Sequence, residues 1–282
     1  MLVAGGRGRV ARALTAAGGA RVHALSRAEL DIRDPDAVAA CLRRLRPRAV
    51  INSAVVGSLE AVEADIAAAR AVNADGPGVL ALACAAAGVP LVHLSTDYVF
   101  GAPTDRPWRE DDPVSPVNAY GAMKAEGERR VLESGAAACV ARVAWVFGDG
   151  EDFLTRMLRG GPEVIIAEQV GSPTPIGPLA GRLLALAAKL AEGAAVPPIL
   201  HLAGTPPASR ADWVEAAFDA YAAAGGGPPR VVRAGRGSFS AAVSRPGFSA
   251  LDCSAAAALF GGPLDWKAAL PALARLWLAD KV

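Results

Sequence analysis

The chain of 282 residues has 29 basic and 28 acidic side chains, a net charge of +1, and 52% hydrophobic residues. This length and apolar content predict one large or two closely packed globular domains with a sizeable core, and argue against disorder. Because the charges balance, the composition does not indicate a nucleic-acid or membrane partner. We find no secretory signal and no transmembrane segment. We expect four scattered cysteines to be reduced, and we predict a cytoplasmic protein.

The first half of the chain alternates short apolar runs with helical segments. Strands are expected at Leu2–Ala4, Val22–Leu25, Ala49–Ile51, Leu91–Leu94 and Cys139–Val143. Helices are expected at Arg9–Ala17, from the N-cap Asp34 to Leu45, over Glu60–Ala87 and at Tyr120–Leu132. Alternation of this kind predicts βαβ units and therefore an α/β fold, a Rossmann-type doubly wound parallel sheet with helices on both faces.

Beyond residue 150 glycine and proline become frequent and the expected helices are shorter. These helices are Leu179–Leu190, Arg210–Ala224 and Asp265–Leu278, with Ser209 and Ser254 as candidate N-caps. We predict a dinucleotide-binding domain over 1–150, completed by 172–205. A smaller, mostly C-terminal substrate-binding lobe would comprise 151–171 and 206–282.

A glycine-rich turn, GGRGRVA at residues 5–11, directly follows the first strand and opens the first helix. Within it, Gly5 suits a tight turn, Gly8 allows close backbone approach, and Ala11 allows close helix–strand packing. The free N–H groups and positive dipole end of the helix favour a pyrophosphate. In a chain with 30 glycines the spacing alone is weak, so its place between strand and helix is what indicates dinucleotide binding.

The end of the second strand carries Ser26 and Arg27 where NAD-binding proteins place an acidic residue, about 20 positions past the glycines. A hydroxyl and a guanidinium match a 2′-phosphate better than a free ribose diol. We therefore predict a preference for NADPH, with NADH as a possible second cofactor. An ordinary surface arginine is the alternative in a chain with 25 of them.

Tyr120 and Lys124 stand four residues apart, on one face of a predicted helix. The chain has only 3 Tyr and 4 Lys, so this spacing is rare by chance. A phenol works poorly as an acid–base catalyst near neutrality unless a nearby cation favours its phenolate, and an ammonium at this spacing can supply that cation. A third hydroxyl, that of Thr96, follows an apolar strand at the sheet edge where ligands bind.

These features resemble the extended short-chain dehydrogenases/reductases, and most closely the dTDP-4-dehydrorhamnose reductase family. The resemblance covers essentially the whole chain. It is carried by the segments AELDIRD (28–34), AVNADGPG (71–78), LSTDYVF (94–100), REDDPVSPVNAYGAMK (109–124), RVAWVFG (142–148), QVGSPT (169–174), HLAGTPPASRADW (201–213) and SRPGFSALD (244–252).

The resemblance implies roles for individual residues. Tyr120 would donate the proton, Lys124 would bind the cofactor and tune Tyr120, and Thr96 would hydrogen-bond the substrate carbonyl. The cofactor would be bound by Gly5, Gly8, Arg9 and Val10 at the pyrophosphate, Ser26 and Arg27 at the adenosine ribose, Asp31 and Ile32 at adenine, and the loop Val55, Val56 and Gly57. The sugar would contact Thr96, Asp97 and Trp145, although Trp145 is alternatively a core aromatic.

The activity implied is NADPH-dependent reduction of the C4 keto group of a nucleotide-linked 6-deoxy-4-keto-hexose, in first place dTDP-4-dehydro-L-rhamnose. Arg210 and Arg245 are candidates for the nucleotide diphosphate. No metal is expected, and a homodimer is possible. Departures from the family pattern at 55–57 and 143–144 keep open a related epimerase or another deoxysugar ketoreductase. A non-catalytic NADP-binding regulatory subunit is a third alternative.

Overall fold

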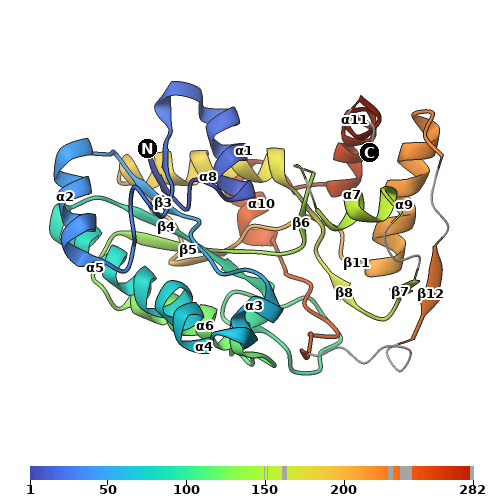
Figure 1. The fold of residues 1–282 in the computed structure, drawn as a ribbon, viewed down its shortest axis with the longest axis horizontal. Helices are drawn as coiled ribbons and strands as arrows, with labels where there is room; N and C mark the ends of the chain where they lie inside the picture. The colour runs from blue at the N-terminus through green and yellow to red at the C-terminus, as the bar shows by residue number, and fades with distance from the viewer. Residues whose placement is uncertain (149, 151, 161–163, 228–230, 236–242, 280–282) are drawn as a thin grey trace.

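The protein is described here from a computed structural model that places residues 1–148, 150, 152–160, 164–227, 231–235 and 243–279. Its centre is a six-stranded sheet in the order β10-β5-β4-β3-β1-β2, in which every neighbouring pair is parallel (Figure 1). The strands are β1 (Leu2–Ala4), β2 (His23–Leu25), β3 (Val50–Asn52), β4 (Leu91–Thr96), β5 (Ala138–Val143) and β10 (Ile199–His201).

Helices cover both faces of this sheet. Successive residues of a strand face opposite sides, so the apolar side chains of each strand pack against helices on both faces. In β1, Val3 belongs to one hydrophobic cluster with residues of α1 (Arg9–Gly18) and α8 (Ile176–Ala191). Its neighbour Leu2 belongs to a second cluster, with residues of α2 (Pro35–Leu45) and α5 (Gly76–Ala87). The helix α6 (Ala119–Leu132) packs beside α5 on that second face. The prediction of a doubly wound parallel sheet is confirmed.

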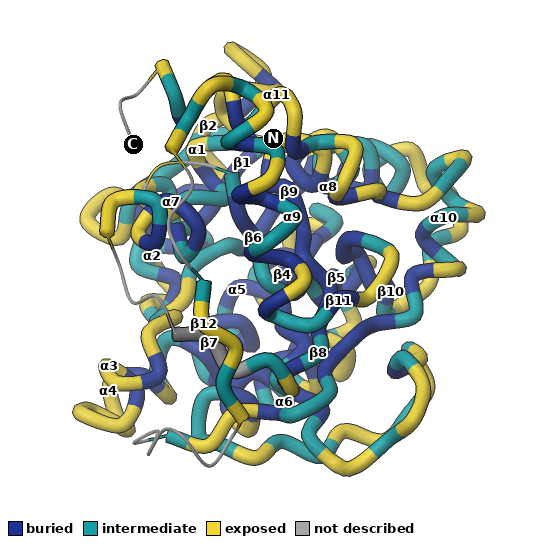
Figure 2. The backbone as a smooth tube through the Cα atoms, turned by 90° about the vertical axis from the view of Figure 1, so that its right-hand side faces the viewer, coloured by how far each residue is buried: buried dark blue, intermediate teal, exposed yellow. Residues whose placement is uncertain are grey.

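The inner strands β1, β3 and β4 are buried along their whole length, whereas His23 of the edge strand β2 is exposed. Figure 2 shows buried residues gathered at the inner strands of the sheet, while many exposed residues follow the outer helices and the loops. The four cysteines are all buried and free. Among the helices of the described ranges, none is both long and apolar enough to span a bilayer.

The segment expected to hold one or two helices over 60–87 is more divided. It contains α3 (Leu59–Ala64), α4 (Ile66–Arg70), a π-helical turn η2 (Ala71–Asp75) and then α5. Asp65 ends α3 and starts α4, because its side chain accepts a hydrogen bond from Ala68 N at 2.9 Å. The predicted N-cap Asp34 is confirmed, since it accepts from Asp36 N and Ala37 N at 3.0 Å.

The C-terminal part builds a separate aromatic core beside the carboxyl ends of the sheet strands, which we call the C-terminal lobe. Its helices are α7 (Phe153–Leu158), α9 (Arg210–Ala223) and α11 (Trp266–Ala279), and they bury Trp213, Phe218, Trp266 and Trp277 together. Its short strands are β6 (Val146–Phe147), β7 (Val164–Ile166), β8 (Val170–Gly171), β9 (Thr174–Pro175), β11 (Ala208–Ser209) and β12 (Val232–Ala234).

Two predicted helix starts in this part have different outcomes. Ser209 caps α9 as expected, accepting from Asp212 N at 3.0 Å. The prediction of Ser254 as an N-cap is wrong, because Cys253 is the N-cap of α10 (Ser254–Phe260) and Ser254 is its first residue. The acceptor at this helix start is Asp252, whose Oδ1 receives the Ser254 N–H at 2.9 Å. A carboxylate one residue ahead of the N-cap therefore replaces the hydroxyl.

Candidate active site

The glycine turn after β1 fits against two neighbouring strands. Gly5 has a φ of +88°, and a Cβ added to it would lie 2.7 Å from Ala54 N, so only glycine fits there. The N–H groups of Gly5 and Gly6 both donate to Leu25 O, at 3.1 and 2.7 Å. These contacts direct the turn, and the start of α1 behind it, toward the carboxyl edge of the sheet.

A cleft lies at this edge, which we call the adenosine cleft. Seven predicted cofactor residues line it, namely Gly5, Gly8, Arg27, Asp31, Ile32, Val55 and Val56. The structure adds five that were not predicted, which are Arg7, Leu30, Ser53, Ala54 and Val72. The helix α1 begins here with Gly8 as an N-cap that supplies no side-chain hydrogen bond. The helix N-terminus therefore presents backbone alone to the cleft, as a pyrophosphate site requires.

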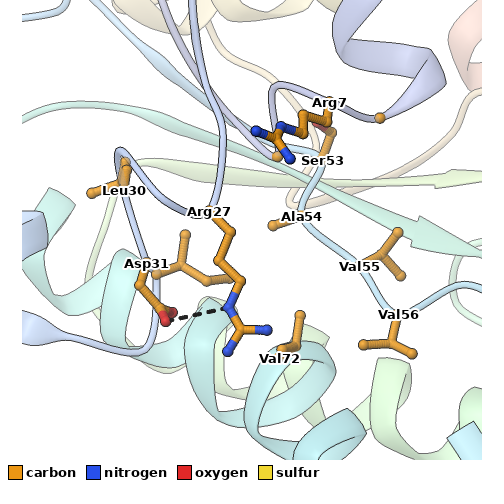
Figure 3. Close-up of a pocket in the computed structure, with 12 residues that line it drawn as sticks. Arg7, Arg27, Leu30, Asp31, Ser53, Ala54, Val55, Val56 and Val72 are labelled. Atoms are coloured by element: carbon orange, nitrogen blue, oxygen red, sulfur yellow. Dashed lines mark ion pairs between the residues drawn. The ribbon is translucent and has the colours of Figure 1, made fainter.

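Two arginines dominate the charge of the adenosine cleft. Figure 3 shows Arg27 reaching toward Asp31, with Arg7 at the top of the view, and Arg27 Nε lies 3.5 Å from Asp31 Oδ2. Hydrogen bonds from Arg33 hold the pKa of Asp31 far below its usual range. Asp31 is therefore ionised and already paired with Arg33, and the Arg27 side chain is 70% exposed.

Three further predicted cofactor residues do not line the adenosine cleft, although Ser26 lines an adjoining pocket with Arg7, Arg27 and Asp31. The hydroxyl and N–H of Ser26 both donate to Glu29 Oε2, at 2.7 and 2.8 Å. The Arg9 side chain donates to Val146 O at 3.2 Å, and the side chain of Val10 packs against the core on the α1 face. For Arg9 and Val10, only the backbone at the helix start is thus left available for the predicted pyrophosphate contact.

A second cleft adjoins the first along the loop after β3, and we call it the reacting cleft. Five predicted residues line it, namely Gly57, Thr96, Asp97, Tyr120 and Trp145. It also includes six further residues, Ser58, Leu59, Glu60, Tyr98, Arg156 and Arg245. The structure thus brings together a phenol, a threonine hydroxyl and an indole from three separate elements. A carbonyl compound held there would meet a proton donor and an apolar ring at once.

Burial sets the protonation of the groups in the reacting cleft. Thr96 Oγ1 donates to Asp97 Oδ1 at 3.0 Å, and Ser249 Oγ lies 2.5 Å from Asp97 Oδ2. Burial raises the pKa of Asp97 to about 6. Burial also raises the pKa of Tyr120, the negative charge of Asp97 adds to this effect, and a hydrogen bond with Thr96 opposes it. Tyr120 therefore keeps its proton at neutral pH, which is the form that can act as an acid.

Lys124 lies behind this cleft with a side chain that is 2% exposed. Its Nζ donates to Leu94 O at 2.7 Å and lies 3.3 Å from His93 Nε2. Burial lowers the pKa of Lys124 to about 8. Burial and the negative charges of Asp97 and Tyr98 raise the pKa of Tyr120, and the hydrogen bond with Thr96 lowers it. The expected lowering of that pKa by Lys124 stays a prediction.

Trp145 is held firmly at the wall of the reacting cleft. Its φ is +39°, and its indole lies against Gly171, where an added Cβ would meet Cε2 at 2.3 Å. The Arg210 guanidinium stacks on the indole at 4.0 Å and donates from Nε to Gln169 Oε1 at 3.1 Å. Arg210 therefore supports Trp145 from behind, whereas Arg245 lines the cleft, 3.5 Å from Glu60.

The residues that sequence reasoning missed differ in how they could have been found. Arg7 lies inside the glycine turn, so its position alone could have indicated it. Arg156 had no such signal among 25 arginines. His93 contacts Lys124, and Asn52 contacts His93. These contacts could not be seen in the sequence, because the second depends on the pairing of β3 with β4 in the sheet. In the described part of the chain, no three His, Cys, Asp or Glu side chains are grouped as metal ligands.

Comparison with known proteins agrees with this arrangement. A family model described as the RmlD substrate binding domain matches residues 1–277. A dTDP-4-dehydrorhamnose reductase of Mycolicibacterium smegmatis is 41% identical, over 96% of this chain and 83% of that protein. A "probable dTDP-4,6-dihydroxy-2-methyloxan-3-one 4-ketoreductase" of Streptomyces antibioticus is 36% identical, over 88% and 84%.

The crystal structure of a dTDP-4-dehydrorhamnose reductase from Clostridium acetobutylicum superposes with a TM-score of 0.88 and 27% identity, covering 98% of this chain and 99% of that one. The chain belongs to the RmlD substrate binding domain family, and it is an NAD(P)-dependent oxidoreductase of the dTDP-4-dehydrorhamnose reductase type.

Proposed function

We propose that the protein reduces the C4 keto group of a nucleotide-linked 6-deoxy-4-keto-hexose with NADPH, and that its substrate is dTDP-4-dehydro-L-rhamnose. The observation that carries this proposal is the reacting cleft next to the adenosine cleft. It is lined by Thr96, by Trp145 and by Tyr120, which keeps its proton at neutral pH. Relatives named as dTDP-4-dehydrorhamnose reductases, at 41% and 38% identity, support the choice of sugar.

The residues of the adenosine cleft fit a phosphorylated dinucleotide. The glycine turn admits close backbone approach, the start of α1 suits the pyrophosphate, and Arg7 and Arg27 suit a 2′-phosphate. When bound, the reduced cofactor would supply the hydride. Because the Ser26 hydroxyl is engaged by Glu29, the preference for NADPH over NADH would depend on the two arginines.

Within the reacting cleft, Tyr120 would protonate the oxygen that gains charge as the carbonyl is reduced, and Thr96 would hydrogen-bond that oxygen. Holding the acid and the carbonyl in one closed site supplies much of the acceleration in such reactions. Trp145 would lie against the hexose ring. We assign the substrate-binding lobe to 151–171 and 206–282, with Arg156 and Arg245, which line the cleft, as candidate cations for a nucleotide diphosphate.

A second candidate function is reduction of a different dTDP-linked deoxysugar. One relative is named as a probable 4-ketoreductase of such a sugar, at 36% identity. Val143 and Ala144, which precede Trp145 and depart from the pattern of the family that the chain resembles, carry no hydroxyl.

The test is a panel of dTDP- and GDP-4-keto-6-deoxyhexoses with purified protein and NADPH, followed by absorbance of the cofactor and NMR of the product. Stoichiometric NADPH oxidation with formation of dTDP-L-rhamnose is expected. Oxidation with another sugar alone would favour the second candidate, and sugar conversion without net oxidation would favour an epimerase. Tight NADPH binding with no conversion of any sugar would contradict a catalytic role.

A further inference from the structure

Ser249 is a buried serine one side chain away from the reacting cleft. It is 2% exposed and lines neither cleft. Its Oγ lies 2.5 Å from Asp97 Oδ2, and Thr96 Oγ1 donates to the other oxygen of that carboxylate, Oδ1, at 3.0 Å. Asp97 is also 2% exposed, and it does line the reacting cleft. Its carboxylate is thus held from two sides, by two hydroxyls that lie far apart in the chain.

Backbone contacts fix the segment of residues 247–252, which carries Ser249. On one side, Ser249 N donates to Val170 O of β8 at 2.8 Å. On the other side, Trp108 donates twice to carbonyl oxygens of the segment, from its backbone N at 2.9 Å and from its indole Nε1 at 3.2 Å. The position of the Ser249 hydroxyl is therefore set independently of Asp97, and the carboxylate is oriented against a fixed group.

The contact between Ser249 and Asp97 has the geometry of a strong hydrogen bond. A hydroxyl and a carboxylate at about 2.5–2.7 Å form a charge-assisted bond, which is about twice as strong as a neutral one. Burial raises the pKa of Asp97 to about 6, and the hydrogen bond from Ser249 is the largest of the effects that oppose burial. Asp97 is therefore ionised at neutral pH. An ionised carboxylate only accepts hydrogen bonds, so both hydroxyls donate to it.

Two donors do not exhaust the carboxylate of Asp97. Each of its oxygens has two lone pairs, so Asp97 can accept further hydrogen bonds from a molecule in the cleft that it lines. A bound hexose presents hydroxyl groups that can donate to such a site. A sugar that lacks the hydroxyl leaves the buried charge with fewer hydrogen bonds than it can take, which is unfavourable. The fixed carboxylate therefore suits recognition of a sugar hydroxyl.

The charged and titratable side chains around Asp97 come from both halves of the molecule. They line the reacting cleft or change the pKa of Asp97, and they are Glu60, Tyr98, Tyr120, Arg156, Arg210 and Arg245. Neither tyrosine is charged at neutral pH, since burial raises the pKa of both. The charge of Arg210 lowers the pKa of Asp97, but by less than the hydrogen bonds from Ser249 and Thr96. These two hydroxyls are therefore the groups whose removal would change the carboxylate most.

We propose that Ser249 is a positioning residue that, together with Thr96, holds the carboxylate of Asp97 in one orientation, so that Asp97 accepts a hydrogen bond from a ring hydroxyl of the sugar. The identity of the ligand rests on the proposed function. The proposal gives the segment 247–252 a part in sugar selection, although Ser249 itself lines neither cleft. Removal of its hydroxyl should weaken recognition of the sugar and leave cofactor binding unchanged.

The first test measures the ionisation of Asp97 without substrate. The ¹³Cγ signals of labelled aspartates report their pKa values by NMR, and Asp97→Asn identifies the signal of Asp97. In Ser249→Ala the pKa of Asp97 should rise by about one unit, because the carboxylate loses a charge-assisted hydrogen bond. Ser249→Thr keeps the hydroxyl and should return the pKa close to its wild-type value. An unchanged pKa in Ser249→Ala would overturn the proposal. If that variant does not fold, Ser249→Cys replaces it, because a thiol donates weakly and should shift the pKa in the same direction.

The matched control is Ser172→Ala. Ser172 is fully buried, and its Oγ accepts a hydrogen bond from Leu251 N at 3.1 Å, two residues from Ser249. The two serines thus support the same segment, but of the two it is Ser249 that contacts Asp97. The pKa of Asp97 should be unchanged in Ser172→Ala. A rise equal to that in Ser249→Ala would overturn the proposal by attributing the effect to packing of the segment.

The second test asks whether the oriented carboxylate recognises a sugar hydroxyl. The accepted 4-keto-6-deoxyhexose is compared with its analogues that lack the hydroxyl at C2 or at C3. In the wild-type protein at least one analogue should lose about tenfold in kcat/KM, because the buried carboxylate then lacks a donor. In Ser249→Ala this loss should shrink to about threefold, mainly through a higher KM for the parent sugar, and in Ser172→Ala it should stay. Equal losses in the wild type and Ser249→Ala, or no loss with either analogue, would overturn selection by Asp97.

The dependence of kcat/KM on pH gives a third readout. The ionised carboxylate is the better acceptor, so kcat/KM for the parent sugar should fall as the pH drops through the pKa of Asp97. Because loss of the Ser249 hydroxyl raises that pKa, the acidic limb should move to higher pH in Ser249→Ala and stay in place in Ser172→Ala. A limb that stays in place in both variants would contradict the proposal. The NMR titration requires neither substrate nor turnover, so failure of the proposed reductase activity would be seen separately, in the sugar panel.

Discussion

The adenosine cleft and the reacting cleft adjoin each other, yet they are assembled in different ways. Every residue lining the adenosine cleft lies within the first 72 positions, and all but Val72 of η2 lie in the segments that follow β1, β2 and β3. The reacting cleft combines residues from Gly57 to Arg245. A site built from consecutive strand ends can be recognised from a local motif. A site built from distant segments depends on the complete fold.

The two clefts also differ in how their charges act. In the adenosine cleft the Arg27 side chain is 70% exposed, so water and salt screen its interactions. In the reacting cleft burial shifts the pKa of Asp97 to about 6 and raises that of Tyr120. A substitution in the adenosine cleft should therefore have a modest effect on cofactor binding, whereas a substitution in the reacting cleft should have a large effect on turnover.

The largest expected effect is that of Tyr120→Phe, which removes the acid and keeps the ring. General acid catalysis contributes about 10²–10⁴-fold, so kcat should fall by about that factor. NADPH affinity, measured by fluorescence titration, should change less than about twofold, because the adenosine cleft is untouched. Tyr221→Phe, in the core of the C-terminal lobe, is the matched control. A kcat within twofold of wild type in Tyr120→Phe would contradict the acid role.

The second expected effect is on stability and concerns the buried ion pair of Arg142 and Glu128. Arg142 and Glu128 are both buried and paired at 2.8 Å, so Arg142→Leu leaves a buried carboxylate without its cation. Breaking such a pair costs about 3–5 kcal/mol in the free energy of unfolding, which urea denaturation measures. Arg129→Ala, which removes the two ion pairs of an exposed arginine on the same helix, with Glu126 and Glu133, should cost much less. Equal losses in the two variants would contradict the importance of burial here.

The smallest expected effect is on cofactor preference and concerns the arginines of the adenosine cleft. Arg27→Ala should lower the ratio of kcat/KM with NADPH to that with NADH by about fivefold, since an exposed charged contact is weak. Adding Arg7→Ala should lower it further, because both arginines line the cleft. The exposed Arg44 of α2, changed to alanine, is the control. An unchanged ratio in the double variant would remove the basis for the NADPH preference.

The same contrast explains how far the sequence could be interpreted. The strand Leu2–Ala4, the cap Asp34 and the glycine turn were predictable because each depends on neighbours in the chain. The spacing of Tyr120 and Lys124 was noticeable because both residue types are scarce. The contact of Lys124 with His93 was not predictable, because it depends on the packing of α6 against the neighbouring strand β4. Nor was the support of Trp145 by Gly171 and Arg210, which come from separate segments.

The short contact between Asp97 and Ser249 spans 152 positions of the chain. Ribosomes make a protein from its N-terminus, so all the residues that line the adenosine cleft have been made after about a quarter of synthesis. The carboxyl of Asp97 obtains its serine partner only when the last segments emerge. A nascent chain could therefore capture a dinucleotide long before it has a finished reacting cleft, and early cofactor binding would stabilise the first half while the rest is still being made.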